Sequence, residues 1–243
     1  MHLTIKIKLE EPLVLPINYH HILQGIIYKN VSHQVMDHTT ETTDKRFPYQ
    51  VREFKLFTFS SLHGKYQVKD KKIIFRSEVC LEVASPDAFM IRKLKNNLQN
   101  YGMDFGQNHI DHMELELSDH TIEKEEVLIK MISPICVYTK ESEEEKPYYF
   151  SPEKEEFYSW INDNFNRKYK MFYGVEPTGK IELKPVRVAP KDNCVTYYKD
   201  IKISAWLGEY MLSGERKYLD FLYQTGIGSK NSQGFGMWSE ITM

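Results

Sequence analysis

Strand and helix patterns recur in the same order in both halves of this 243-residue chain. Apolar residues alternate where a strand is expected and recur every three or four positions where a helix is expected. The first half contains, in order, a strand at 2–9, a helix at 18–36, strands between 54 and 83, a helix at 85–100 and a strand at 113–117. This is the order of the ferredoxin-like βαββαβ unit.

The second half repeats that order after an acidic stretch, 119–126, which is typical of a domain boundary. Its segments are a strand at 127–139, a helix that starts with Ser151 at the N-cap and Pro152 at N1, strands at 181–188 and 195–207, a helix at 215–224 and a strand at 237–241. We therefore predict an α+β protein of two tandem ferredoxin-like (RRM-like) domains, 1–125 and 126–243. A single larger α+β domain is the alternative.

Composition argues against several classes of protein. No apolar run approaches the roughly 20 residues that span a bilayer, and the N-terminal stretch alternates like a strand instead of containing a signal-peptide core. Cys80, Cys136 and Cys194 are scattered without CxxC spacing, which argues against a zinc knuckle and favours a reducing compartment. We therefore expect a cytoplasmic protein with no membrane contact.

Charge is segregated along the chain although the formal net charge is only -2. Residues 44–76 hold nine Lys and Arg against three acids, whereas residues 114–126 hold six acids against one Lys. A local basic patch can attract a polyanion even when the whole protein is slightly acidic. Two solvated faces of different charge explain the pattern equally well.

Four glycines lie close together near the C-terminus, around a short polar run. We predict that this segment is a loop with exposed amide N–H groups, suited to phosphate oxygens. The candidate RNA contacts in it are Gly226, Gly228, Ser229, Lys230, Asn231, Gly234 and Gly236. It is neither a Walker loop nor a dinucleotide fingerprint, since the glycines required by those motifs are missing. A helix cap followed by a tight turn is the alternative, but a cap accounts for the first glycine alone.

Metal chemistry has no motif in this sequence, and we expect neither a metal nor a cofactor. There is no HExxH, and His109 and His112 fall at a turn where their spacing does not converge. RNA can be cut without metal because its 2′-hydroxyl is a nucleophile held beside the phosphate. Such a site needs a general acid or base and a cation, roles that suit histidine and lysine.

His38 is the candidate for acid–base catalysis, since it follows the first helix in a polar loop just before the basic segment. Lys55 is the candidate cation, Tyr28 a candidate for orienting phosphate or hydroxyl, and Arg52 a candidate RNA contact. An uninvolved surface histidine and a core tyrosine are the alternatives for His38 and Tyr28. His20 or His21 could contact phosphate, although a folding role is equally compatible with their position.

Three segments resemble the CRISPR-associated repeat-processing endoribonucleases of the RAMP superfamily, the Cas-six family. They are the first helix (18–28), the strand Arg52-Glu53-Phe54-Lys55-Leu56-Phe57-Thr58-Phe59-Ser60 and the glycine segment 226–237. The resemblance implies two ferredoxin-like domains and metal-independent cleavage of CRISPR repeat RNA to a 2′,3′-cyclic phosphate and a 5′-hydroxyl. It also implies catalytic roles for His38, Lys55 and Tyr28. One departure is that 39–46 lacks the glycine that often follows the family's histidine.

Two other functions remain open from the sequence. One is a non-catalytic RNA-binding subunit of a CRISPR effector complex, because the family's histidine varies in position. The other is an unrelated ferredoxin-like small-molecule or regulatory protein, which the pI near 6.5 favours. The partners that we consider are CRISPR repeat RNA, an effector complex and a second copy of the chain.

Overall fold

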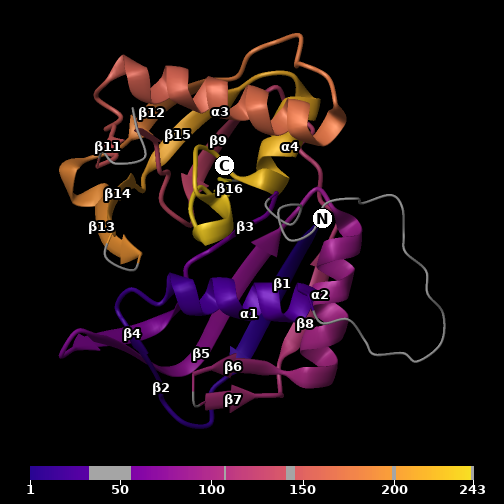
Figure 1. Ribbon diagram of the computed structural model, residues 1–243, viewed down its shortest axis with the longest axis vertical. Helices are drawn as coiled ribbons and strands as arrows, with labels where there is room; N and C mark the ends of the chain where they lie inside the picture. The colour runs from indigo at the N-terminus through magenta and orange to yellow at the C-terminus, as the bar shows by residue number, and fades with distance from the viewer. Residues whose placement is uncertain (33–55, 107, 141–145, 199–200, 242–243) are drawn as a thin grey trace.

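The two halves of the chain form two sheets, each covered by helices, in a computed structural model (Figure 1). The structure describes residues 1–32, 56–106, 108–140, 146–198 and 201–241. In Figure 1 the first half, from indigo to magenta, lies below the second half, from orange to yellow.

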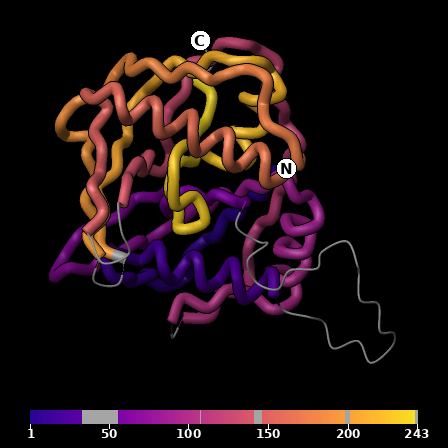
Figure 2. The backbone as a smooth tube through the Cα atoms, turned by 45° about the horizontal axis from the view of Figure 1, so that its top comes forward, coloured from indigo at the N-terminus to yellow at the C-terminus, as the bar shows by residue number. Residues whose placement is uncertain are grey.

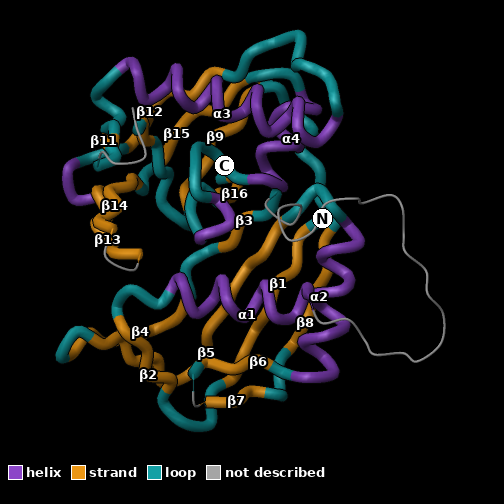
Figure 3. The backbone as a smooth tube through the Cα atoms, viewed as in Figure 1, coloured by secondary structure: helices purple, strands orange, loops and turns teal. Residues whose placement is uncertain are grey.

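The first sheet is built around two long antiparallel strands, β1 (His2–Lys8) and β5 (Lys72–Ala84). β8 (Glu114–Ser118) pairs with the other edge of β1, and β5 also pairs with β2 (Leu13–Pro16), β3 (Thr58–Phe59) and β4 (His63–Lys69). The order β8-β1-β5-β3/β4 is that of a ferredoxin-like sheet. The helices α1 (His20–Ser32) and α2 (Ala88–Tyr101), drawn in purple in Figure 3, accompany this sheet. Their apolar side chains contribute to its core.

Helix α2 begins where its sequence predicts. The side chain of Asp87 accepts the N–H groups of Phe89 and Met90, which satisfies two free donors of the first turn. The helix ends at Gly102, whose N–H bonds the carbonyl of Leu98. A short hairpin, β6 (Met103–Phe105) and β7 (Asn108–Ile110), then leads to β8.

The second sheet has the same topology in the order β12-β15-β9-β16. Its framework is β9 (Glu126–Met131), α3 (Glu155–Tyr173), β12 (Glu182–Arg187), β15 (Glu209–Ser213), α4 (Arg216–Thr225) and β16 (Trp238–Glu240). Two hairpins are inserted: β10 (Tyr138–Thr139) with β11 (Tyr148–Tyr149), and β13 (Asn193–Tyr198) with β14 (Ile201–Trp206). A 3₁₀ turn, η1 (Pro190–Asp192), precedes β13. Both halves therefore have the predicted ferredoxin-like arrangement.

Several local expectations were wrong. The strand β15, an inner strand of the second sheet, was not predicted at all. Helix α3 begins at Glu155 instead of beside Ser151, because residues 151–154 form a turn in which the N–H of Lys154 bonds the Ser151 carbonyl. The strand expected over 54–60 is limited to Thr58–Phe59 among its described residues. Gly25 interrupts α1 without a packing reason, since a Cβ there would meet nothing within 4 Å.

The linker between the halves packs on the second domain. Ile122 is buried in the second core, and its N–H lies 3.3 Å from the carboxylate of Asp220. β8 ends at Ser118 and β9 begins at Glu126, so the proposed boundary at 125/126 stays a prediction inside this linker. None of the described helices is both long enough and apolar enough to cross a bilayer.

Candidate functional site

The glycine segment begins where α4 ends. The N–H of Gly226 closes the helix by bonding the Leu222 carbonyl at 2.8 Å. The chain then passes through a short 3₁₀ turn, η2 (Asn231–Gln233), and enters β16. We call residues 226–236 the glycine loop. Figure 2 shows it, in yellow, extending from the second domain to the first.

Close packing accounts for all four glycines of this loop. Each has a positive φ, between 74° and 87°. An added Cβ would lie 1.9 Å from the Ile227 carbonyl oxygen at Gly236, 2.7 Å from the Cys136 carbonyl oxygen at Gly228 and 2.6 Å from the Phe59 ring at Gly234. The alternative of a helix cap followed by a tight turn therefore accounts for all four glycines, and the argument that it explains the first alone was wrong.

The loop amides are largely used inside the protein. The N–H groups of Gly226, Gly234 and Gly236 bond the carbonyls of Leu222, Asn231 and Pro134, respectively. They are not the open donors that the sequence suggested. Contact between these glycines and RNA stays a prediction, and their clear role in the structure is to shape the loop.

Asn231, another predicted RNA contact, points into the loop. Its Nδ2 donates to the carbonyls of Ile227 (3.1 Å) and Phe235 (3.0 Å), and its Oδ1 accepts from Lys168 Nζ at 3.1 Å. The sequence reasoning missed Lys168. It follows Phe157, Ile161 and Phe165 at helical spacing, and a lysine on that apolar face was the available signal.

Ser229 and Lys230 are partly exposed polar residues of the loop, just before η2. The N–H of Ser229 bonds the Cys136 carbonyl at 2.8 Å, and its hydroxyl accepts from Asn164 Nδ2 at 3.3 Å. The ammonium group of Lys230 lies 4.4 Å from the centre of the Tyr138 ring. A cation over an aromatic face remains available to a phosphate on its other side.

The first domain meets the loop through α1 and β3. Gln24 Nε2 donates to the Ser232 carbonyl at 2.7 Å, and the Thr58 hydroxyl donates to the Phe235 carbonyl at 3.1 Å. The structure therefore joins the glycine loop directly to the other two segments that carry the family resemblance.

The histidine pair that begins α1 lies at this junction. The His20 ring is 5.9 Å from the Phe235 ring and 6.1 Å from the Phe59 ring, in edge-on contacts. Burial lowers the pKa of His20 to about 4, so this side chain is neutral at physiological pH. The His21 ring is on the surface, where its Nδ1 lies 2.7 Å from the Asn18 carbonyl oxygen.

Tyr28 is the one predicted catalytic residue in the described part of the chain. It is half-buried on α1, one turn beyond Gln24, and its ring makes an edge-on contact with Phe57 at 5.5 Å. His38, Arg52 and Lys55 lie outside the described residues. The roles of all four residues stay predictions.

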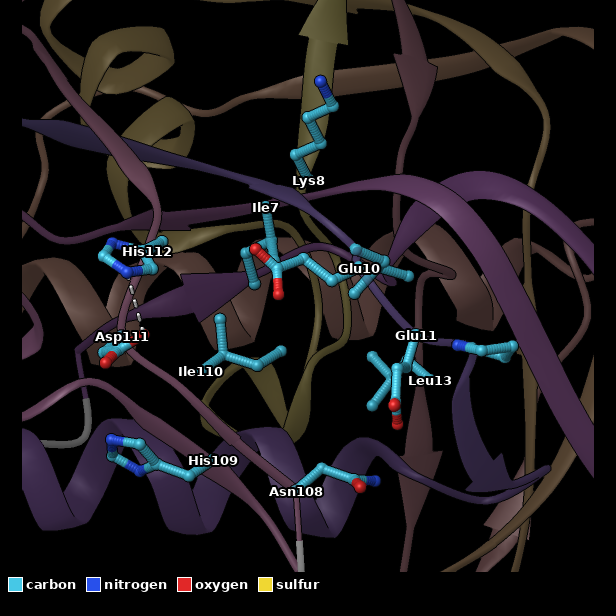
Figure 4. Close-up of a pocket in the computed structure, with 12 residues that line it drawn as sticks. Ile7, Lys8, Glu10, Glu11, Leu13, Asn108, His109, Ile110, Asp111 and His112 are labelled. Carbon is cyan, nitrogen blue, oxygen red and sulfur yellow. Dashed lines mark ion pairs between the residues drawn. The ribbon is translucent and has the colours of Figure 1, made fainter.

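A second group of polar side chains lies away from the loop, between the β1–β2 turn and β7 (Figure 4). His112 lies against Asp111 at 3.7 Å, and His109 bonds Asp104 at 2.7 Å. Hydrogen bonds from His109 and Lys29 lower the pKa of Asp104. Within the described ranges, no three His, Cys, Asp or Glu side chains converge as a metal site would require.

Comparison with known proteins identifies the family. The profile described as "CRISPR associated protein Cas6, C-terminal" matches residues 114–240, which is 127 of the 243 residues. The chain belongs to the Cas6 family. This is the Cas-six family whose motifs the sequence resembles.

Individual Cas6 proteins resemble this chain over nearly its full length. "CRISPR-associated endoribonuclease Cas6 1" of Methanocaldococcus jannaschii is 25% identical over 241 residues, covering 98% of this chain and 91% of that protein. "CRISPR-associated endoribonuclease Cas6" of Pyrococcus furiosus is 28% identical over 233 residues, covering 92% and 82%. The solved structure of a Cas6-related protein of Pyrococcus furiosus superposes with a TM-score of 0.80 at 20% identity, covering 99% and 98% of the two chains.

Proposed function

We propose that this Cas6 protein is a metal-independent endoribonuclease that cuts CRISPR repeat RNA and so produces guide RNAs. The observation that carries the proposal is the direct bonding of the glycine loop to α1 and β3. In the sequence, His38 and Lys55 lie between α1, which ends at Ser32, and β3, which begins at Thr58. Because the loop contacts Gln24 and Thr58, both elements that flank this segment lie against the loop.

The proposed reaction is an attack within the RNA. The 2′-oxygen forms a bond to the adjacent phosphorus, and the bond from phosphorus to the 5′-oxygen breaks. The 2′-hydroxyl proton passes to a base, and the leaving oxygen takes up a proton, which gives a 2′,3′-cyclic phosphate and a 5′-hydroxyl. His38 acts as base or acid, Lys55 stabilises the charge that builds on the phosphate, and Tyr28 orients the phosphate or hydroxyl.

RNA binding is assigned to the exposed end of the loop and to the basic segment. Ser229 offers a hydroxyl and Lys230 a cation, and Arg52 adds a second cation from the first domain. The glycines and Asn231 give the loop the shape that presents the first two residues. The curated relatives named as Cas6 endoribonucleases support this assignment of RNA as the ligand.

The test uses labelled repeat RNA incubated with the protein in the presence of EDTA. Cleavage should persist, and a 2′-deoxy substitution at the scissile nucleotide should abolish it because the nucleophile is gone. Loss of cleavage on chelation would refute the metal-independent mechanism. Tight RNA binding without cleavage, unchanged in His38→Ala, would instead identify a non-catalytic RNA-binding subunit.

A further inference from the structure

A lysine without a carboxylate partner lies buried beneath the glycine loop. Lys168 is 8% exposed, and its Nζ donates to the carbonyl of Gly226 at 2.5 Å and to Asn231 Oδ1 at 3.1 Å. Within the described part of the chain, no acidic side chain forms a salt bridge with it. Burying an ammonium group costs free energy unless the group is well hydrogen-bonded. A lysine kept in this position therefore indicates a specific function.

Asn231 connects Lys168 to the two segments of the loop, the one that leaves α4 and the one that leads to β16. Its amide donates to Ile227 in the outgoing arm and to Phe235 in the returning arm. The amide fits because two glycines line it: a Cβ would lie 2.8 Å from Asn231 Nδ2 at Gly226 and 2.6 Å from it at Gly236. Lys168 and Asn231 thus form one hydrogen-bonded unit that closes the base of the loop.

Helix α3 holds the loop at a second point. Asn164 lies one helical turn before Lys168 and donates to the Ser229 hydroxyl at 3.3 Å. The base of the loop is therefore fixed by Lys168 and its exposed end by Asn164. Both contacts come from one face of one helix, which gives Ser229 and Lys230 a defined place relative to the second domain.

We propose that Lys168 and Asn231 are positioning residues for RNA binding, which hold the glycine loop so that Ser229 and Lys230 meet the RNA backbone together. This inference rests on the proposed function. Lys168 does not contact RNA itself, since its ammonium group is buried and bonded within the protein. It acts through the loop, and its effect on the salt dependence of RNA binding should disappear when Lys230, the cation of the loop, is removed.

The test compares the salt dependence of RNA binding in four proteins: wild type, Lys168→Met, Lys230→Ala and the double variant. Met keeps the length and flexibility of the lysine stem without its donors. The probe is a repeat RNA with a 2′-deoxy scissile nucleotide, which cannot be cut. Lys168→Met should weaken RNA binding about ten-fold, as expected when the misplaced loop loses one charge-assisted contact between Lys230 and a phosphate. It should also lower the slope of log affinity against log salt by about one.

The double variant distinguishes two roles of Lys168: positioning the glycine loop for RNA binding, or only stabilising the folded protein. If Lys168 acts through the loop, adding Lys168→Met to Lys230→Ala should leave the slope unchanged and lower the affinity less than Lys168→Met does in the wild type, because only the Ser229 contact is left to lose. Lys170→Met is the matched control, because it removes an exposed lysine of the same helix whose ion pair in the described part of the chain is with Glu176 at the surface. Lys168→Gln, which keeps an N–H donor, should fall between wild type and Lys168→Met. Additive effects, or an equal loss in Lys170→Met, would overturn the inference.

Hydrogen exchange gives a measurement that does not depend on RNA. The amides of Ser229 and Gly236 are bonded within the protein, so loosening the loop should speed their exchange about ten-fold in Lys168→Met and not in Lys170→Met. Unchanged exchange would refute the positioning role whatever the enzyme does. Conversely, a wild type that binds RNA without cutting it would refute the proposed reaction while leaving the positioning result intact.

Discussion

The two domains hold the glycine loop by different means. On the second-domain side the loop encloses a polar unit, with Lys168 and Asn231 bonded to three of its carbonyls. On the first-domain side, among the described residues, it rests on aromatic rings and accepts hydrogen bonds from Gln24 and Thr58. The difference indicates that the loop is built as part of the second domain and docks against the first. We therefore expect substitutions in the first domain to change the rate of RNA cleavage and substitutions in the second domain to change the affinity for RNA.

The largest expected effect is on the first-domain side. His38→Ala should lower the single-turnover cleavage rate by about 10² to 10⁴-fold, the usual contribution of general acid–base catalysis. The dissociation constant for uncleavable RNA should stay the same, because the loop is untouched. An equal loss of cleavage rate and RNA affinity would show that catalysis and RNA binding are not divided between the two domains.

Loop glycines should be far less tolerant than the helix glycine of the first domain. Gly236→Ala places a Cβ 1.9 Å from a backbone oxygen at φ 78°, so we expect a loss of about 3 kcal/mol or more in unfolding free energy. Gly25→Ala, in open space on α1, should instead stabilise by about 0.5–1 kcal/mol. Urea titrations of both variants measure the contrast. Similar stabilities would mean that the loop is looser than its contacts indicate.

The buried lysine should give stability a distinctive pH dependence. Burial lowers the pKa of Lys168 from 10.5 to about 7, so between these values the unfolded chain binds a proton that the folded chain has lost. The unfolding free energy of the wild type should therefore rise with pH between 7 and 10.5 relative to Lys168→Met, by up to about 1.4 kcal/mol per pH unit. Below pH 7 the difference should be flat.

Urea unfolding of the wild type and Lys168→Met across this pH range tests the expectation, with Lys170→Met as the control. A constant difference between wild type and Lys168→Met would show that Lys168 titrates normally. The polar unit of the second-domain side would then be more open to water than its 8% exposure indicates.

The smallest expected effect concerns the exposed end of the loop. Lys230→Ala should lower the salt slope of RNA binding by about one, since one phosphate contact is lost, and should leave the cleavage rate of bound RNA nearly unchanged. Filter binding at several salt concentrations, followed by single-turnover cleavage at saturating protein, separates the two quantities. A large loss of cleavage rate would show that the loop contributes to catalysis as well as to RNA binding.

Local patterns predicted much of the fold. Alternation and helical spacing located most of the framework strands and helices, because these periods follow from which face of an element is buried. They failed at β15, a five-residue strand between Gly208 and Gly214 that looks like part of a loop. They also failed at the start of α3, where a good capping sequence forms a turn instead.

The candidate site shows the limit more sharply. The sequence by itself determined most of the order of elements, the family and the place of the glycine segment, since these depend on residues close together in the chain. Only the tertiary structure decided what that segment does inside the molecule. Lys168 and Gly226 are 58 positions apart, and Thr58 and Phe235 are 177 apart. No local pattern records such contacts, because the first forms only when two distant segments of the second domain pack together and the second only when the two domains do.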